Sequence, residues 1–131
     1  MPRCVRKACL ATALPLLLLA HGAAAQTSRP FPATALRGTL QVVQPPDVLV
    51  NGKADRLSPG ARIRGSDNML QMSGALTGVK LLVHYTREPS GLVHDVWILT
   101  ADEAGRKPWP ATPEEAQRWV FNPAAQTWTR P

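Results

Sequence analysis

Turn-forming residues interrupt the apolar segments of this chain at intervals of roughly 8–12 residues between Gly38 and Thr100. Gly, Pro, Asn and Asp at such spacing leave room for short strands and none for a long helix. Roughly five or six strands fit between the turns, and several are rich in β-branched residues. The pattern predicts a mainly-β fold, a small antiparallel β-barrel.

The dipeptide Asn51-Gly52 gives the strongest hairpin signal in the chain. It follows an apolar run at residues 48–50, and both residues tolerate the positive φ that a two-residue type I′ turn requires. The returning strand is expected over residues 53–57. The tripeptide Ser58-Pro59-Gly60 predicts another turn, which separates that strand from a further one at residues 61–64.

Two apolar segments, Val79–Thr86 and Leu92–Thr100, flank the turn sequence Glu88-Pro89-Ser90-Gly91. Proline at the second turn position and glycine at the fourth predict a type I turn closed by a glycine bulge. The resulting register would pair Val83 with Trp97 and Tyr85 with Asp95, and would place Val96 on the opposite face. Both faces of this hairpin are apolar, so both need cover.

The C-terminal segment can supply part of that cover. Thr112-Pro113-Glu114-Glu115 is typical of a helix start, with threonine as the N-cap. Ala116, Trp119 and Val120 follow at helical spacing. Three tryptophans of this segment are expected to pack onto the barrel, and the alternative is an exposed aromatic binding surface. They are Trp109, Trp119 and Trp128.

Residues 1–25 have the organisation of a cleavable signal peptide. A basic start precedes an apolar run from Ala8 to Ala20, which is short of the roughly 20 residues that span a bilayer, and Ala23-Ala24-Ala25 fits a signal-peptidase site. The alternative is an uncut membrane anchor. The expected organisation is therefore a signal peptide at 1–25, an extended lead-in at 26–37, a barrel at 38–101 and a tail with a short helix at 102–131.

Cleavage changes the composition of the protein. Removal of Arg3, Arg6 and Lys7 leaves 12 of the 15 basic residues against 9 acidic ones, so the net charge becomes +3 in place of +6. This modest excess does not favour nucleic-acid binding. Both cysteines, Cys4 and Cys9, leave with the signal peptide, which excludes disulfides, thiol catalysis and thiolate metal sites from the exported chain.

Three sequence phrases, Leu49–Lys53, Arg56–Ile63 and Gly91–Thr100, resemble a family of small exported proteobacterial proteins that has no assigned activity. The order of turns and strands is also similar to OB-like small barrels of bacterial envelopes. The resemblance supports an OB-like fold and the exported location expected from the signal peptide, which is periplasmic in a Gram-negative host and otherwise secreted. It implies no cofactor or catalytic residue.

Two pairs of residues are candidate site residues. His84 and His94 would share one face of the predicted hairpin at a diagonal spacing that could bind a metal, although two histidines do not complete a zinc site. The alternative is that both are hydrogen-bonded to neighbours. Arg62 and Arg64 alternate with apolar residues and could bind an anionic polymer or an acidic protein, or could be the solvated face of an edge strand.

No nucleophile, phosphate-binding or metalloprotease motif is present in the sequence. We therefore expect a non-enzymatic envelope protein that binds another protein or a polymer through Arg62 and Arg64. The alternative is a metal or small-molecule carrier that uses the face bearing His84 and His94.

Overall fold

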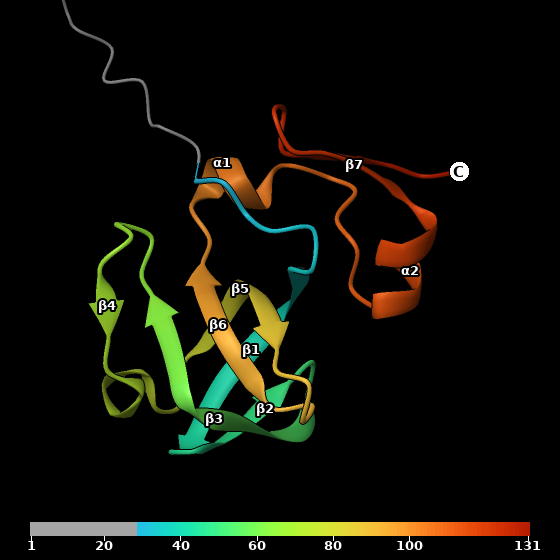
Figure 1. Ribbon diagram of the computed structural model, residues 1–131. Helices are drawn as coiled ribbons and strands as arrows, with labels where there is room; N and C mark the ends of the chain where they lie inside the picture. Colours follow the sequence, from blue (N-terminus) through green and yellow to red (C-terminus); the bar gives the residue numbers. More distant parts are fainter. Residues whose placement is uncertain (1–28) are drawn as a thin grey trace, which may run out of the picture.

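The computed structural model describes residues 29–131, so the predicted signal peptide and both cysteines lie outside the described residues. The chain runs from a short lead-in through six strands to a tail that carries two short helices and a hairpin (Figure 1). In chain order the elements are β1 (Leu36–Gln44), β2 (Asp47–Val50), β3 (Lys53–Arg64), β4 (Leu70–Gln71), the 3-10 turn η1 (Ser73–Leu76), β5 (Lys80–Arg87), β6 (Val93–Ile98), α1 (Ala101–Ala104), α2 (Pro113–Arg118), β7 (Val120–Asn122) and β8 (Thr127–Thr129).

Five of the strands close into a barrel-like ring. The sheet order is β2-β1-β5-β6-β3-β4, and an additional pairing of β2 with β3 closes the first five of these strands into the ring and leaves β4 at its edge. The mainly-β, barrel-like architecture is therefore as predicted. One pairing differs from the antiparallel expectation, because β3 and β6 run parallel. The ring is therefore mixed, with one parallel pairing among its antiparallel ones.

Side chains from alternate positions of the five strands fill the interior of the ring, as the period of two in a strand requires. Leu40, Val42, Val83, Val93 and Val96 are fully buried there. The lead-in contributes no strand until Leu36, where β1 begins.

The predicted hairpin at Asn51-Gly52 is confirmed. Val50 pairs with Lys53, and Asn51 and Gly52 have φ angles of 52° and 79°. The side chain of Asn51 also fixes the turn against β1, since its Oδ1 accepts a hydrogen bond from the backbone N–H of Thr39 at 3.0 Å. Two neighbouring strands are thereby held in register by one turn.

The predicted turn at Ser58-Pro59-Gly60 is wrong. Residues Lys53–Arg64 form one continuous strand, which pairs with β2 in its first part and with β6 and β4 in its last part. The register with β6 shifts between Leu57 and Arg62, so the strand bulges at this tripeptide instead of reversing. A bulge also accommodates Pro59, which has no N–H to donate to a ladder.

The predicted turn between β5 and β6 is confirmed, but the predicted register beyond it is wrong. The N–H of Glu88 donates to the carbonyl of Leu92 at 2.8 Å, and Gly91 has a φ of 91°. Further along, Val83 pairs with Ile98 and Tyr85 with Val96.

The cause of this shift is a bulge in β6 opposite Thr86. The hydroxyl of Thr86 accepts a hydrogen bond from the N–H of Asp95 at 3.2 Å, so a side chain replaces one step of the ladder. Because one extra residue reverses the faces, Trp97 lies on the side of His84 and not on that of Tyr85. The predicted pair of Tyr85 with Asp95 does not form.

The tail covers the outer face of the β5–β6 hairpin with a second apolar cluster. Trp109 and Trp128 are buried against Phe31, and Trp119 is partly buried in the same cluster, so the predicted packing of the aromatic tail is confirmed. The predicted helix start is confirmed too, because Thr112 caps α2 by accepting from the N–H of Glu115. Val120, expected on the helix, instead begins the β7–β8 hairpin.

Buried ionic groups tie the lead-in and α1 to the ring. The guanidinium of Arg29 binds both carboxylate oxygens of Glu103, at 3.0 and 2.6 Å, and also donates to the carbonyls of Gly65 and Ile98. Arg37 donates to three carbonyl oxygens in and just after α1. One charged residue from the lead-in therefore connects β3, β6 and α1.

Candidate binding surface

A groove of about 430 Å³ runs along β3 at the place where that strand bulges. It lies between the β1–β2 turn and the segment that joins β4 to η1. Its floor is mainly apolar, and Ser58 is its most buried polar residue, with an exposed fraction of 4%. The residues that line it are Pro45, Pro46, Leu57, Ser58, Pro59, Ala61, Ile63, Gln71, Met72 and Ser73.

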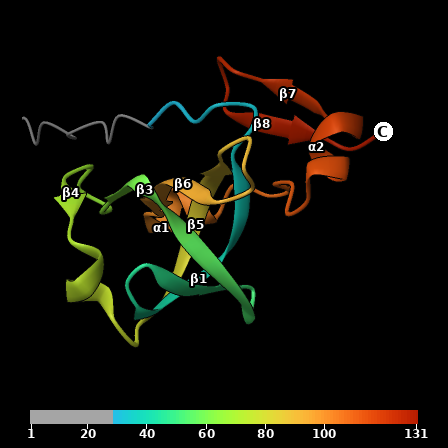
Figure 2. The same ribbon diagram turned by 60° about the horizontal axis from the view of Figure 1, so that its bottom comes forward.

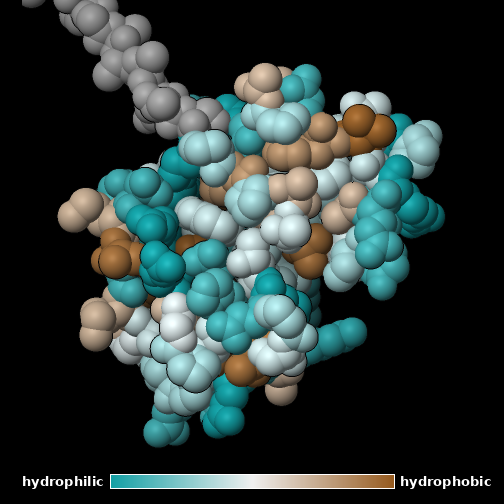
Figure 3. Space-filling view, in the orientation of Figure 1, coloured by the Kyte–Doolittle hydropathy of each residue, from teal (hydrophilic) through white to brown (hydrophobic). Residues whose placement is uncertain are grey.

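The wall of the groove formed by β4 continues into an exposed apolar patch. Met69, Leu70 and Met72 have exposed fractions of 65%, 63% and 80%. Figure 3 shows brown and tan atoms gathered at the left side of that view, over β4, with teal atoms beside them. Figures 1 and 2 place β4 on the side of the ring away from α2, so the tail does not cover this patch. Exposed apolar patches of this kind mark interaction sites in soluble proteins.

Arg62 and Arg64 lie on the neighbouring strand, at the edge of this patch. Ile63 between them points into the core with 3% exposure, so the predicted alternation is correct and the two arginines point outward. Arg64 is the register partner of Leu70. Neither arginine forms an ion pair or a hydrogen bond with any residue in the part of the chain that is described. Both charges are therefore available to a partner.

We call these features together the β3–β4 surface: the groove, the patch of Met69, Leu70 and Met72, and the pair Arg62 and Arg64. The two arginines were identified from the sequence as candidates, whereas the apolar patch was not. The missed signal is two methionines and a leucine within four residues, just after the turn residues Gly65-Ser66-Asp67. The strand formed there, β4, has only two residues, and Met69 and Met72 flank it.

His94 is in contact with two polar residues, one of which, Ser58, lines the groove. Its Nδ1 is 3.0 Å from Oγ of Ser58 and 3.1 Å from Oε1 of Glu88. A serine hydrolase needs the serine on one ring nitrogen and the acid on the other, so that a proton can pass through the ring. Here both groups approach the same nitrogen, and the arrangement is a structural hydrogen-bond cluster that joins β3 to the β5–β6 turn.

His84 lies on the outer face of β5, completely buried beneath the tail. Its ring stacks on Trp109 at a centroid distance of 4.1 Å, and its Nε2 accepts a hydrogen bond from Arg37 at 3.2 Å. Burial, with a smaller contribution from the positive charges of Arg37 and Arg29, lowers the pKa of His84 to about 3. The ring is thus neutral at physiological pH.

The structure does not bring His84 and His94 together. The prediction that they share a face depended on a register that the bulge in β6 breaks. The lone pair of His84 Nε2 is already used by Arg37. Within residues 29–131 there is no group of three or more His, Cys, Asp or Glu side chains that could hold a metal ion.

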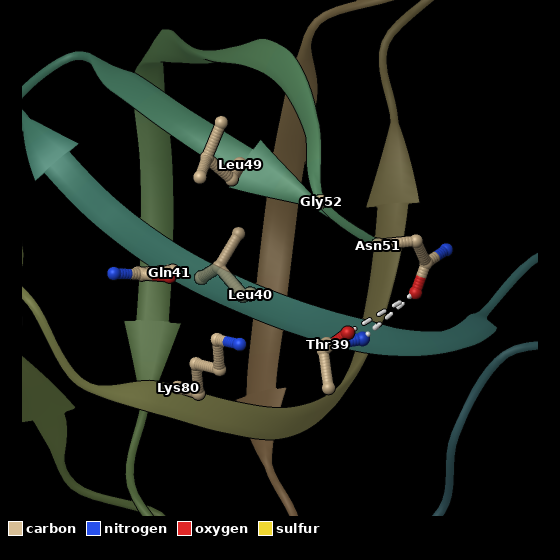
Figure 4. Close-up of a pocket in the computed structure, with 7 residues that line it drawn as sticks. All are labelled: Thr39, Leu40, Gln41, Leu49, Asn51, Gly52 and Lys80. Atoms are coloured by element: carbon tan, nitrogen blue, oxygen red, sulfur yellow. Dashed lines mark hydrogen bonds between the residues drawn. The ribbon is translucent and has the colours of Figure 1, made fainter.

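A second, smaller pocket of about 290 Å³ lies on the outer face of β1, β2 and β5 (Figure 4). Gln41 and Lys80 are register partners there, and the side chain of Asn51 is engaged by Thr39. In Figure 4 the side chains of Gln41 and Lys80 point in different directions, so they do not converge on one ligand atom. This pocket lacks the focused polar groups of a ligand site.

No protein-family model, curated protein or solved structure matches this chain. Among residues 29–131, no helix has both the length and the apolar character needed to cross a membrane.

Proposed function

We propose that this protein is a non-enzymatic binding module of the cell envelope, exported by its N-terminal segment, which docks a segment of another protein on the β3–β4 surface. The observation that carries the proposal is the exposure of Met69, Leu70 and Met72 beside two arginines that have no partner among the described residues. The segment that fits this surface combines apolar and acidic side chains.

The apolar patch supplies the attraction. Burying one methionine or leucine side chain contributes about 1.5–3 kcal/mol, so three such residues can support a specific complex even after the cost of association is subtracted. Methionine also adapts its shape to a partner because its side chain is unbranched. A sugar polymer would make little use of these side chains, which favours a protein over a polysaccharide.

The arginines supply selectivity. Arg62 and Arg64 lie at the rim of the patch, where a carboxylate of the partner keeps access to water and a basic side chain is repelled. Arginine is enriched at protein interfaces because its planar guanidinium can bind carboxylates with two hydrogen bonds. Asp95 on β6 is the register partner of Arg62, but among the described residues neither it nor Asp67, whose carboxylate accepts from the N–H of Met69, forms an ion pair with either arginine.

Site-specific photo-crosslinking in the host cell tests the proposal. A photoreactive residue at Leu70 should give a crosslinked protein whose attached peptide contains both apolar and acidic residues. The same group at Val120, which is 68% exposed on β7, is the matched control and should not give this product. The double variant Arg62→Glu with Arg64→Glu should lower the yield by about tenfold, because like charges would then face the partner.

A second charge reversal of the same size controls for net charge. Lys53→Glu with Lys80→Glu changes two exposed lysines away from the β3–β4 surface and should leave the yield unchanged. The proposal is refuted if crosslinking at Leu70 is no greater than at Val120, or if the reversal of Arg62 and Arg64 has no effect. A crosslinked product that resists protease would identify a polymer in place of a protein.

A further inference from the structure

All sulfur atoms of the chain after residue 10 lie on the β3–β4 surface. The sequence has three methionines and two cysteines, and Met1, Cys4 and Cys9 are in the N-terminal segment that we expect to be removed. Met69 and Met72 are therefore the two remaining sulfur-bearing side chains. Both are among the most exposed large apolar residues of the described chain.

The backbone at these two methionines is fixed, whereas their side chains are free. The N–H of Met69 donates to Oδ1 of Asp67 at 3.0 Å, and its carbonyl accepts from the N–H of Gly65 at 2.8 Å. The carbonyl of Met72 accepts from the N–H of Ala75 at 3.0 Å, at the start of η1. Neither thioether belongs to the apolar core clusters.

From this arrangement we infer that Met69 and Met72 form an oxidation-sensitive site, and that conversion of their thioethers to sulfoxides by a peroxide releases the partner from the β3–β4 surface. The inference rests on the proposed function, because it concerns regulation of that same surface.

The reaction needs no group beyond the thioether and the oxidant. A sulfur lone pair attacks one oxygen of hydrogen peroxide, an S–O bond forms and the O–O bond breaks. The proton on the transferred oxygen passes to the departing hydroxide, which leaves as water. Sulfur loses two electrons and peroxide gains them, so methionine and hydrogen peroxide give methionine sulfoxide and water.

The consequence for binding follows from the change in polarity. A sulfoxide is polar and a strong hydrogen-bond acceptor, so it stays hydrated and opposes burial in an apolar contact. The fold is not affected, because Met69 and Met72 contribute their backbone and not their side chains to the packed structure. The two methionines therefore change the surface without changing the stability.

The experiment measures crosslinking from Leu70 with and without prior treatment of the protein with hydrogen peroxide. Mass spectrometry should find one added oxygen on each of Met69 and Met72. Crosslinking should fall by about tenfold, with the thermal midpoint unchanged, and should recover when the two methionine sulfoxide reductases are added together. Fluorescence of anilinonaphthalene sulfonate, an apolar anion that matches the β3–β4 surface, should fall in parallel.

The matched variant is Met69→Leu with Met72→Leu, which keeps the apolar volume and removes the sulfur. It should crosslink as the unmodified protein does, and peroxide should not affect it. Met69→Gln with Met72→Gln imitates the polar product and should bind poorly without any oxidant. If both sulfoxides form and crosslinking from Leu70 persists, the oxidation inference is overturned while the proposed function stands. If the untreated protein gives no product, both are overturned.

Discussion

The ion pair between Arg29 and Glu103 provides the most direct test of how the lead-in is held to the ring. The two side chains are 11% and 5% exposed, and the shortest distance between them is 2.6 Å. We expect that Arg29→Met, which keeps most of the apolar stem and removes the charge, strongly destabilises the protein. The Glu103 carboxylate would then remain buried, with the backbone N–H of Thr100 as the hydrogen-bond donor left to it among the described residues.

The magnitude follows from the burial. Removal of one partner of a buried ion pair costs about 3–5 kcal/mol, because the other charge is left without compensation. For a domain of this size, about 1 kcal/mol corresponds to a change of about 4–8 °C in the thermal midpoint, so we expect a loss of at least about 12 °C. Arg56→Met is the matched control, since Arg56 and Asp47 form an exposed pair at 3.4 Å and should contribute less than about 1 kcal/mol.

The same pair makes stability depend on pH in a defined direction. Burial alone would raise the pKa of Glu103, but hydrogen bonds from Arg29 and Thr100 and the charge of Arg29 outweigh it and hold the pKa below its ordinary value of 4.5. The unfolded chain therefore binds a proton on Glu103 at higher pH than the folded chain does. The contribution of the pair is complete above pH 4.5 and is lost as the pH falls through the lower, folded-state pKa.

Urea denaturation followed by tryptophan fluorescence measures these effects in a double-mutant cycle of Arg29→Met and Glu103→Leu. The double variant should lose less free energy of unfolding than the two single losses added together, since it leaves no unpaired charge. Additive single effects, or a loss for Arg29→Met no larger than that for Arg56→Met, would show that the ion pair does not anchor the lead-in.

Two further predictions concern the second apolar cluster. Trp109→Ala should lower the free energy of unfolding, measured by urea denaturation, by about 3–5 kcal/mol. The Trp109 side chain is buried, with 6% exposure, it stacks on His84, and its N–H donates to the carbonyl of Ala35 at 3.0 Å. A loss below about 1 kcal/mol would contradict this packing. The free energy of unfolding should fall as the pH falls from about 6.5 towards 3, by up to about 1.4 kcal/mol per pH unit. The reason is that His84 takes up a proton in the unfolded chain and stays neutral in the folded chain. His84→Gln should reduce this slope between pH 6 and 4, as measured by urea titrations at each pH, and an unchanged slope would refute the assignment of this pH dependence to His84.

Local turn chemistry explains which parts of the fold could be predicted. Asn51, Gly52 and Gly91 have positive φ angles, which few other residue types adopt readily. Both turns can therefore be predicted from a few neighbouring residues. The N-cap at Thr112 is local in the same sense. The capping box of Thr100 with Glu103 was equally readable, but the apolar run before it suggests a strand that continues through Thr100.

Long-range features could not be predicted in this way. The bulge opposite Thr86 depends on a hydroxyl from the neighbouring strand, and nothing in the sequence of β6 alone signals it. One extra residue then moves Trp97 from the barrel interior to the outer face. Likewise, Ser58-Pro59-Gly60 has the composition of a turn, and it forms a bulge because β6 and β4 both pair with the end of β3.

The candidate site shows the same division between local and long-range information. The outward direction of Arg62 and Arg64 follows from strand alternation and was predictable, whereas the exposure of Met69, Leu70 and Met72 depends on how far β4 extends. Had β4 continued beyond Gln71, it would have lain beside the bulge of β3 and closed the groove. Because the chain turns into η1 after two strand residues, the groove stays open and its apolar wall faces solvent. The short length of β4 thus creates both the apolar surface and its position beside the arginines, which is why we propose the binding site there and not at either histidine.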